Sequence, residues 1–181
     1  METSMDNATR QLVQYARYHR DPRNIATHTI GIPLIAFAIA ALLARAQWAT
    51  AGLVISADWV VWTLVTAWYL TLGQRALTLS TAGVLALLVA LAHPLGTAPL
   101  NTWLAWGLGC FVVGWVFQFV GHYWEGRKPA FVDDLRGLLI GPMFVVAELG
   151  FALGAGRALH AAIEAAAGPV RRRGPAGKLP E

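Results

Sequence analysis

The middle of this sequence is nearly free of charge. Between Thr29 and Phe119, the charged residues are Arg45, Asp58 and Arg75. Over the whole chain only 13% of the residues are charged, whereas an ordinary soluble domain has roughly 25%. A soluble domain needs polar residues to cover its outer surface, and this stretch cannot supply them. The sequence therefore predicts an integral membrane protein whose helices are surrounded by lipid.

The apolar residues fall into five segments, separated by polar residues, glycine and proline. These segments are 30–44, 59–72, 76–92, 102–120 and 135–158. A membrane-spanning helix needs about 20 apolar residues, so the first segment is short for a complete span. We expect an all-α, polytopic membrane protein with about five hydrophobic segments, within a range of four to six. Residues 45–58 contain a smaller apolar piece, and Asp58 is expected to cap the helix that follows.

The N-terminal region is polar and lacks the apolar core of a cleaved signal peptide. Residues 6–20 predict an amphipathic helix, with side chains at spacings of three and four residues on one side: Leu12, Tyr15, Tyr18 and His19. Asp21 and Pro22 are expected to end this helix, because the residue before a proline is disfavoured in a helix. Residues 24–29 then form a predicted polar hinge.

Much of the net charge of +4 is concentrated at the two ends of the chain. Basic ends around apolar segments indicate contact with anionic lipid headgroups. Nucleic-acid binding is not expected, because no basic face is interleaved with aromatic residues. The single cysteine, Cys110, excludes an intrachain disulfide and a thiolate metal cluster. We expect one helical membrane domain over residues 1–165 and a disordered basic tail over 166–181.

Alternation of successive spans distributes the histidines between the two membrane faces. The arginines before the first segment place the N-terminus on the cytoplasmic side. Counted from there, His19, His28 and His122 share the cytoplasmic face, and His93 lies on the opposite face. The fifth segment allows two paths: it crosses the membrane, or the glycine and proline at 141–142 kink it into a re-entrant hairpin.

Two histidines flank the predicted break near the N-terminus. His19 and His28 are nine residues apart, so one continuous helix would point them in opposite directions. Pro22 interrupts the helix between them, which allows both rings to face one point. The alternative is two separate surface histidines near the lipid headgroups.

Further polar side chains end the fourth segment and interrupt the fifth. Gln118, His122 and Glu125 follow i, i+4, i+7 spacing and share one helical face. Such a glutamate either binds a metal beside the histidine or fixes the tautomer of its ring; an interfacial His–Glu hydrogen bond is the alternative. Glu148 is a functional candidate because an ionisable group in an apolar span is costly, although a helix–helix hydrogen bond would also explain it.

Three of the histidines together suit a metal site. His19, His28 and His122 on one face would offer a nitrogen ligand set for Fe(II) or Zn(II), with positions open for substrate and O₂, and imidazole alone does not choose between these metals. Di-iron membrane hydroxylases and desaturases need more histidines, in tight clusters. This chain has five histidines in all and no such cluster, which argues against that class.

Two motif blocks resemble a known membrane family. The first, Tyr15 to Pro33, reads Tyr-x-x-Tyr-His-Arg-x-Pro-x-Asn-x-x-x-His-x-x-Gly-x-Pro. The second reads Trp-Val-Phe-Gln-Phe-Val-Gly-His over 115–122 and continues through Glu125, Arg127, Pro129, Ala130, Asp133, Gly141, Pro142 and Glu148. Together they are similar to the membrane 2-hydroxy fatty acid dioxygenases, whose fungal founder acts in the endoplasmic reticulum. The similarity covers about residues 11–151; Asp134 departs from the family, which more often has asparagine there, and His93 matches no family pattern.

The resemblance implies a non-haem, Fe(II)-dependent dioxygenase of α-oxidation. In this reaction a 2-hydroxy fatty acid and O₂ give a fatty acid one carbon shorter, with release of the carboxyl carbon. The resemblance also implies that His19, His28 and His122 are the catalytic iron ligands. It places six further side chains around the ligands or the substrate: Tyr15, Tyr18, Asn24, Gln118, Glu125 and Glu148.

Two other function classes stay open, a small transporter and a non-catalytic membrane scaffold. A transporter would need polar residues in the middle of its spans, and only Glu148 clearly provides one. For the enzyme we expect a bacterial inner membrane, or the endoplasmic reticulum in a eukaryote, with the site on the cytoplasmic side. The acyl-chain length and the oligomeric state, a homo-oligomer included, stay open.

Overall fold

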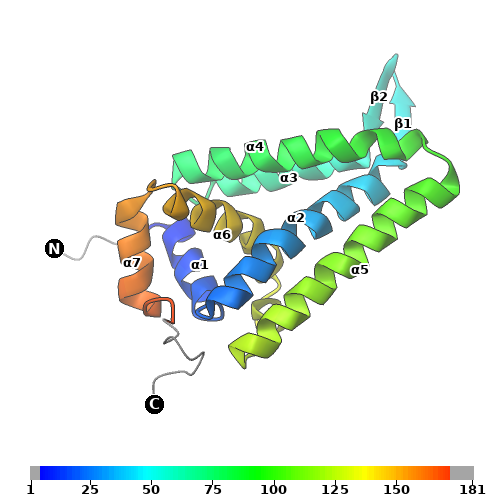
Figure 1. The fold of residues 1–181 in the computed structure, drawn as a ribbon. Coiled ribbons are helices and arrows are strands. Elements are labelled where there is room, and N and C mark those ends of the chain that lie inside the picture. Colours follow the sequence, from blue (N-terminus) through cyan, green and yellow to red (C-terminus); the bar gives the residue numbers. More distant parts are fainter. Residues whose placement is uncertain (1–4, 172–181) are drawn as a thin grey trace.

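The computed structural model describes residues 5–171, and this part is almost entirely helical (Figure 1). Its seven α-helices are α1 (Asn7–Ala16), α2 (Pro22–Ala44), α3 (Ala57–Leu70), α4 (Arg75–Ala92), α5 (Leu100–Glu125), α6 (Arg136–Ala152) and α7 (Arg157–Ala167). Two short 3-10 helices, η1 (His93–Thr97) and η2 (Ala130–Val132), and two strands, β1 (Gln47–Thr50) and β2 (Leu53–Ser56), complete it. The helical architecture is confirmed, and the hairpin is a departure from the all-α prediction.

Three helices in the described residues are long and apolar enough to cross a membrane. They are α2, the continuous run of α4 and η1, and α5. The α6–α7 pair would make a fourth span, but it is bent by 116° at its break. The structure thus supports three or four spans where about five hydrophobic segments were predicted. The difference arises because the second segment forms a helix of only 14 residues, α3, and the fifth is broken.

α2 and α5 lie side by side and antiparallel along most of their length (Figure 1). Glycines allow their backbones to approach closely. A Cβ atom at Gly114 would lie 2.8 Å from the carbonyl oxygen of Gly31 and 2.6 Å from Cγ1 of Ile35. At the other end of the pair, the indole N–H of Trp103 donates to the carbonyl oxygen of Ala41 at 2.8 Å. This helix pair is the frame that carries two of the predicted site histidines.

The break between α1 and α2 lies earlier than the predicted hinge. The Asp21 carboxylate accepts the N–H of Arg23 at 2.9 Å and caps α2. Pro22 occupies the first helical turn, where its missing N–H is not needed. Residues 24–29, predicted as the hinge, therefore form the first turns of α2, and the chain reverses over residues 17–21. His19 lies in this turn and His28 in the helix.

A short β-hairpin connects α2 to α3. Its strands pair antiparallel with Gln47 opposite Ser56. Ala51 and Gly52 at its tip have φ angles of 49° and 78°, the left-handed conformations that a tight two-residue hairpin requires. The sequence left this connection open, and its prediction for Asp58 was wrong: Ser56 holds the N-cap position of α3, while Asp58 lies in the first turn.

The fifth hydrophobic segment folds back on itself. The N–H of Arg171 donates to the carbonyl oxygen of Arg20 at 2.8 Å, and Arg20 Nη1 donates to the carbonyl oxygen of Gly168 at 2.8 Å. Just before α6, the Asp133 carboxylate accepts the hydroxyl of Tyr18 at 2.7 Å. Both ends of the α6–α7 unit therefore lie beside the 17–21 turn, because the chain turns back at the bend between the two helices. The predicted domain boundary at 165 falls inside α7, and residues 172–181 of the predicted tail lie outside the described residues.

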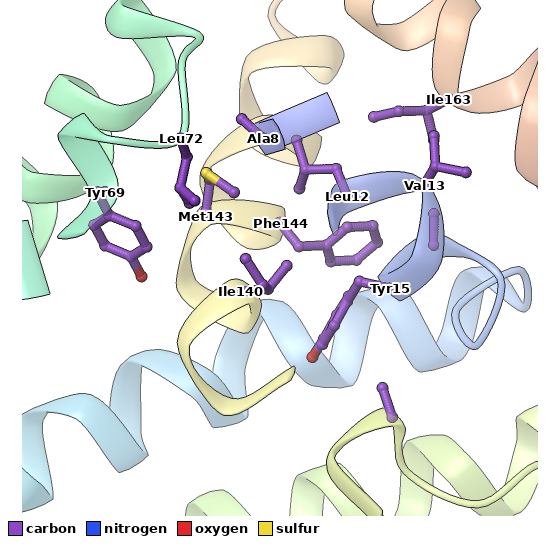
Figure 2. Close-up of a cluster of buried hydrophobic side chains, with 12 residues drawn as sticks. Ala8, Leu12, Val13, Tyr15, Tyr69, Leu72, Ile140, Met143, Phe144 and Ile163 are labelled. Atoms are coloured by element: carbon purple, nitrogen blue, oxygen red, sulfur yellow. The ribbon is translucent and has the colours of Figure 1, made fainter. Parts of the chain in front are cut away.

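A cluster of buried apolar side chains attaches α1 to α6, α7 and the end of α3 (Figure 2). Leu12 of α1 and Phe144 of α6 are at its centre and are almost completely buried. Full burial of one such side chain stabilises the fold by about 1.5–3 kcal/mol. The other labelled members are Ala8, Val13, Tyr15, Tyr69, Leu72, Ile140, Met143 and Ile163. The amphipathic N-terminal helix is thus part of the core, and it fixes the position of the turn that follows it.

Candidate metal centre

Three histidines that are distant in sequence meet inside the protein. His19 comes from the turn after α1, His28 from the second turn of α2, and His122 from the last turn of α5. Each offers a ring nitrogen, and these atoms all lie within 4.8 Å of one another. The exposed fractions of the three residues are 0%, 1% and 6%. This cluster could hold a metal ion, because it offers three buried nitrogen ligands close together.

The hydrogen bonds of His19 and His28 determine where their ring protons lie. Nδ1 of His19 donates to the carbonyl oxygen of Tyr15 at 2.7 Å, and Nδ1 of His28 donates to that of Asn24 at 2.9 Å. Because a carbonyl oxygen only accepts, both Nδ1 atoms carry the proton. Nε2 of each neutral ring then carries a lone pair and no proton, and these two nitrogens lie 3.0 Å apart. A single cation could accept both lone pairs at this distance.

The third ring also has a nitrogen without a hydrogen-bond partner. Nδ1 of His122 is buried and has no hydrogen-bond partner. The ring also forms a hydrogen bond with the backbone of Arg127. Burial, reinforced by the neighbouring His28 ring, holds the pKa of His19 well below its ordinary value, so this ring stays neutral at physiological pH. The donor set therefore fits a metal cation: neutral rings with unshared electron pairs and little access for water.

Glu125 fixes the turn that carries His19. Its Oε2 atom accepts the backbone N–H groups of Arg20 at 2.9 Å and Asp21 at 2.7 Å, and the side-chain amide of Asn24 at 3.1 Å. Its Oε1 atom lies 3.4 Å from a guanidinium nitrogen of Arg171. Glu125 does not belong to the cluster of possible ligand atoms. Since it follows His122 by one helical turn, it ties the end of α5 to the turn of His19.

Aromatic side chains hold the His19 ring in position. Tyr15 stacks on it with ring centroids 4.1 Å apart and an angle of 7° between the planes. Phe144 of α6 lies against the same ring at 5.4 Å. Tyr18 points elsewhere, toward Asp133, while its carbonyl oxygen accepts from Asn24. Phe144 is a contact that the sequence analysis missed, because nothing in the pattern of α6 distinguishes it from an ordinary core residue.

Two of the predicted polar residues have unused atoms beside the histidines. Nε2 of Gln118 and Oδ1 of Asn24 are buried and have no hydrogen-bond partner. Gln118 lines a cavity together with His28 and His122. Gly121, between them on α5, has no room for a side chain, because an added Cβ would contact Thr27 and Asn24. Close packing of α2 on α5 thus brings these groups to one point.

Glu148 is placed differently from the other predicted site residues. It interacts electrostatically with Arg20, His160 and Glu164, and it is not part of the three-histidine cluster. Arg20 itself reaches the end of α7 through the carbonyl oxygen of Gly168. The glutamate therefore lies in a charged group that joins α6 and α7 to the 17–21 turn. The sequence analysis missed this role of Arg20, although an arginine next to a candidate ligand was visible.

Two of the three histidines, His28 and His122, line a large apolar cavity of about 390 Å³. Most of its wall comes from five helices, α2, α3, α4, α5 and α6. The wall residues of α2 are His28, Ile32, Ile35, Ala36, Ile39, Ala40 and Leu43, and those of α5 are Phe111, Trp115, Gln118 and His122. Residues of α3, α4 and α6 complete the lining. A long apolar ligand with a polar headgroup would therefore meet the histidines at one end and hydrocarbon surface along its length.

Comparisons with known proteins identify relatives of this chain. Residues 5–153 match the family model described as Mpo1-like, 2-hydroxy-palmitic acid dioxygenase. The 2-hydroxy-palmitic acid dioxygenase MPO1 of Saccharomyces cerevisiae is 36% identical to it over 156 residues, which cover 85% of this chain and 86% of the yeast protein. No solved structure matches the chain significantly.

Proposed function

Since the chain belongs to the Mpo1-like family of 2-hydroxy-palmitic acid dioxygenases, we propose that it is an Fe(II)-dependent dioxygenase that shortens 2-hydroxy fatty acids by one carbon. The carboxyl carbon is released, and the carbon that carried the hydroxyl becomes the new carboxyl group. The observation that carries this proposal is the junction of the buried three-histidine cluster with the apolar cavity. A long-chain 2-hydroxy acid has the polarity pattern that this junction offers.

His19, His28 and His122 would hold the iron through their unprotonated nitrogens. Bound iron would supply the redox chemistry that activates O₂. Imidazole nitrogens bind Fe(II) and Zn(II) alike, so the choice of iron is supported by the family to which the chain belongs.

Residues next to the histidines would orient the substrate headgroup. The free Nε2 amide of Gln118 is a donor without a partner, and it lines the cavity beside His28 and His122. We expect it to donate a hydrogen bond to the substrate carboxylate. Three neutral imidazoles add no negative charge, so an anionic headgroup is attracted to the metal-loaded site. The acyl chain would then extend along the cavity between α2, α3 and α5.

The membrane would hold both the protein and its substrate. α2, α4 with η1, and α5 can cross a bilayer, and the acyl chain of the substrate already lies in lipid. We propose an inner membrane location in a bacterium, or the endoplasmic reticulum in a eukaryote. The basic residues near the histidine end favour the cytoplasmic side for the site.

The proposal is tested with the purified full chain in detergent, loaded with Fe(II). We expect 2-hydroxypalmitate to be consumed in air, together with O₂, and the saturated acid one carbon shorter to appear. Palmitate, which lacks the hydroxyl, serves as the matched substrate control and should stay unchanged. If 2-hydroxypalmitate is not consumed by the iron-loaded protein, the proposed activity is wrong.

A further inference from the structure

The cavity that His28 and His122 line continues along one face of α2. Its wall on this helix runs from His28 to Leu43, which is about 22 Å at 1.5 Å per helical residue. The N–H of Ala57 donates to the carbonyl oxygen of Ala46 at 2.9 Å, so the start of α3 is attached just beyond the end of α2. Asp58, in the first turn of α3, also lines the cavity. It therefore lies at the end opposite the histidines.

Asp58 is an unusual residue for such a wall. Its side chain is completely buried, and Oδ2 lies 2.8 Å from Nδ1 of His93. Oδ1 is buried without a hydrogen-bond partner. The neighbouring wall residues are Leu43, Val61 and Trp62. A buried carboxyl oxygen that accepts nothing is costly, and Asp58 makes no helix cap that would explain its position.

We infer that Asp58, held by His93, closes the far end of the cavity and sets the longest acyl chain that the protein binds. This inference rests on the proposed function, because it takes the acyl chain as the occupant, with its carboxyl group at the histidines. Each methylene that binds along the apolar walls is transferred from water to an apolar surface, which is favourable. A methylene that reaches Asp58 would instead cover the free Oδ1 without offering it a hydrogen bond. His93 fixes the carboxyl group, so it cannot turn away from the chain.

The inference predicts a break in affinity at one chain length. Below the break, each added methylene improves binding by roughly fourfold, the factor that corresponds to one buried CH₂. Beyond the break the gain stops, and covering the carboxyl oxygen lowers the affinity by roughly tenfold. An open groove without such a stop would give a continuous rise followed by a plateau.

Saturated straight-chain fatty acids without a 2-hydroxyl are the probes, because they measure binding without turnover. Their dissociation constants for the full chain in detergent are compared between the wild type and Asp58→Ala. We expect the break to move to longer chains in Asp58→Ala, with the roughly fourfold gain per methylene continuing past the wild-type limit. A break at the same length in both proteins would overturn the inference.

A second variant tests the same end of the cavity without touching the carboxyl group. Ala40 of α2 is 4% exposed, lines the wall, and belongs to a cluster against which Trp62 of α3, one helical turn after Asp58, is packed. Ala40→Leu should move the break to shorter chains, the opposite direction from Asp58→Ala, and it keeps the inference testable if Asp58→Ala does not fold. Glu164→Ala on α7, an acidic residue of an exposed ion pair with His160, is the matched control and should leave the break unchanged.

The two proposals fail in distinguishable ways. If the break moves as expected but 2-hydroxypalmitate is never consumed, the proposed activity is wrong while the limit at Asp58 stands. If 2-hydroxypalmitate is consumed and the break does not move in either cavity variant, the inference about Asp58 is wrong and the activity stands.

Discussion

At the scale of single residues, hydrogen bonds determine which nitrogen of each site histidine carries a proton and which is free to bind a metal. Backbone carbonyl oxygens accept hydrogen bonds from the Nδ1–H groups of His19 and His28, which leaves the Nε2 lone pairs of the two rings close together. The Glu125 carboxylate accepts hydrogen bonds from two backbone N–H groups of the 17–21 turn. Each ring is therefore oriented before any metal binds. This preorganisation reduces the conformational entropy that metal binding would otherwise cost.

Removal of the Glu125 carboxylate should weaken metal binding although it is not among the possible ligands. Glu125→Ala would leave the N–H groups of Arg20 and Asp21 and the amide of Asn24 without their acceptor. Loss of an outer partner of this kind typically lowers metal affinity by 10- to 100-fold. Metal competition titrations would measure the loss. Glu125→Gln, which keeps an acceptor oxygen, should lose less, and equal affinity in the wild type and Glu125→Ala would exclude this role.

Replacement of Gln118 should affect substrate binding and spare the metal. Its Nε2 atom has no partner in the protein, and a hydrogen bond to a charged group contributes about 1.5–3 kcal/mol. Gln118→Leu should therefore weaken the binding of 2-hydroxypalmitate by roughly 10- to 100-fold, with unchanged iron content. Substrate binding under anaerobic conditions and iron analysis test both points. Unchanged substrate affinity would show that the amide does not contact the carboxylate.

At the scale of helices, the approach of α2 to α5 brings His28 and His122 together. The sequence predicted both helices and the shared face of Gln118, His122 and Glu125, because these depend on local periodicity. It did not predict the turn at 17–21, since the same residues also suit a hinge after Pro22. The sequence did not predict the hairpin either, because a short apolar run does not distinguish a strand from a helix. The depth of packing at Gly31 and Gly114 depends on the partner helix and is not readable from either segment alone.

Enlargement of a glycine in this helix pair should disturb the site from a distance. A Cβ at Gly114 would lie 2.6 Å from Ile35 and 2.8 Å from the Gly31 carbonyl oxygen, so Gly114→Ala must push the helices apart. Overpacking of this kind costs about 1–3 kcal/mol, and we expect a lower thermal unfolding temperature together with weaker iron binding. Gly109→Ala on the same helix is the control, because nothing lies within 4 Å of its added Cβ. Equal stability of the two variants would contradict the close approach.

At the scale of the whole molecule, the two ends differ in charge. In the described part of the chain, Arg45 is the basic residue beside the hairpin and η1, where it donates to the carbonyl oxygen of Ala98. The histidine end carries a much larger basic set: Arg17, Arg20, Arg23, Arg127, Lys128 and Arg171. The bend between α6 and α7 keeps Arg171 at this end. The sequence analysis could not predict how this bend is held, because it depends on contacts of α7 with the turn after α1.

This asymmetry predicts the orientation of the protein in its membrane. Positive residues stay on the cytoplasmic side, so the hairpin should face the other side. In a Cys110→Ser background, a cysteine at Thr50 should react with a membrane-impermeant thiol reagent in intact cells, and one at Lys128 should react only after permeabilisation. Both positions are exposed, so access does not depend on local unfolding. Labelling of both cysteines from the same side would exclude this topology.

The central claim, that three distant histidines hold the catalytic metal, is tested most directly by the iron content of single variants. The account predicts stoichiometric iron in the wild type and its loss in His19→Ala, His28→Ala and His122→Ala, with unchanged iron in His160→Ala, whose ring lies outside the cluster beside Glu164. Thermal unfolding of the iron-free proteins would show that the variants still fold. Iron retained at the wild-type level in all three variants would contradict the account.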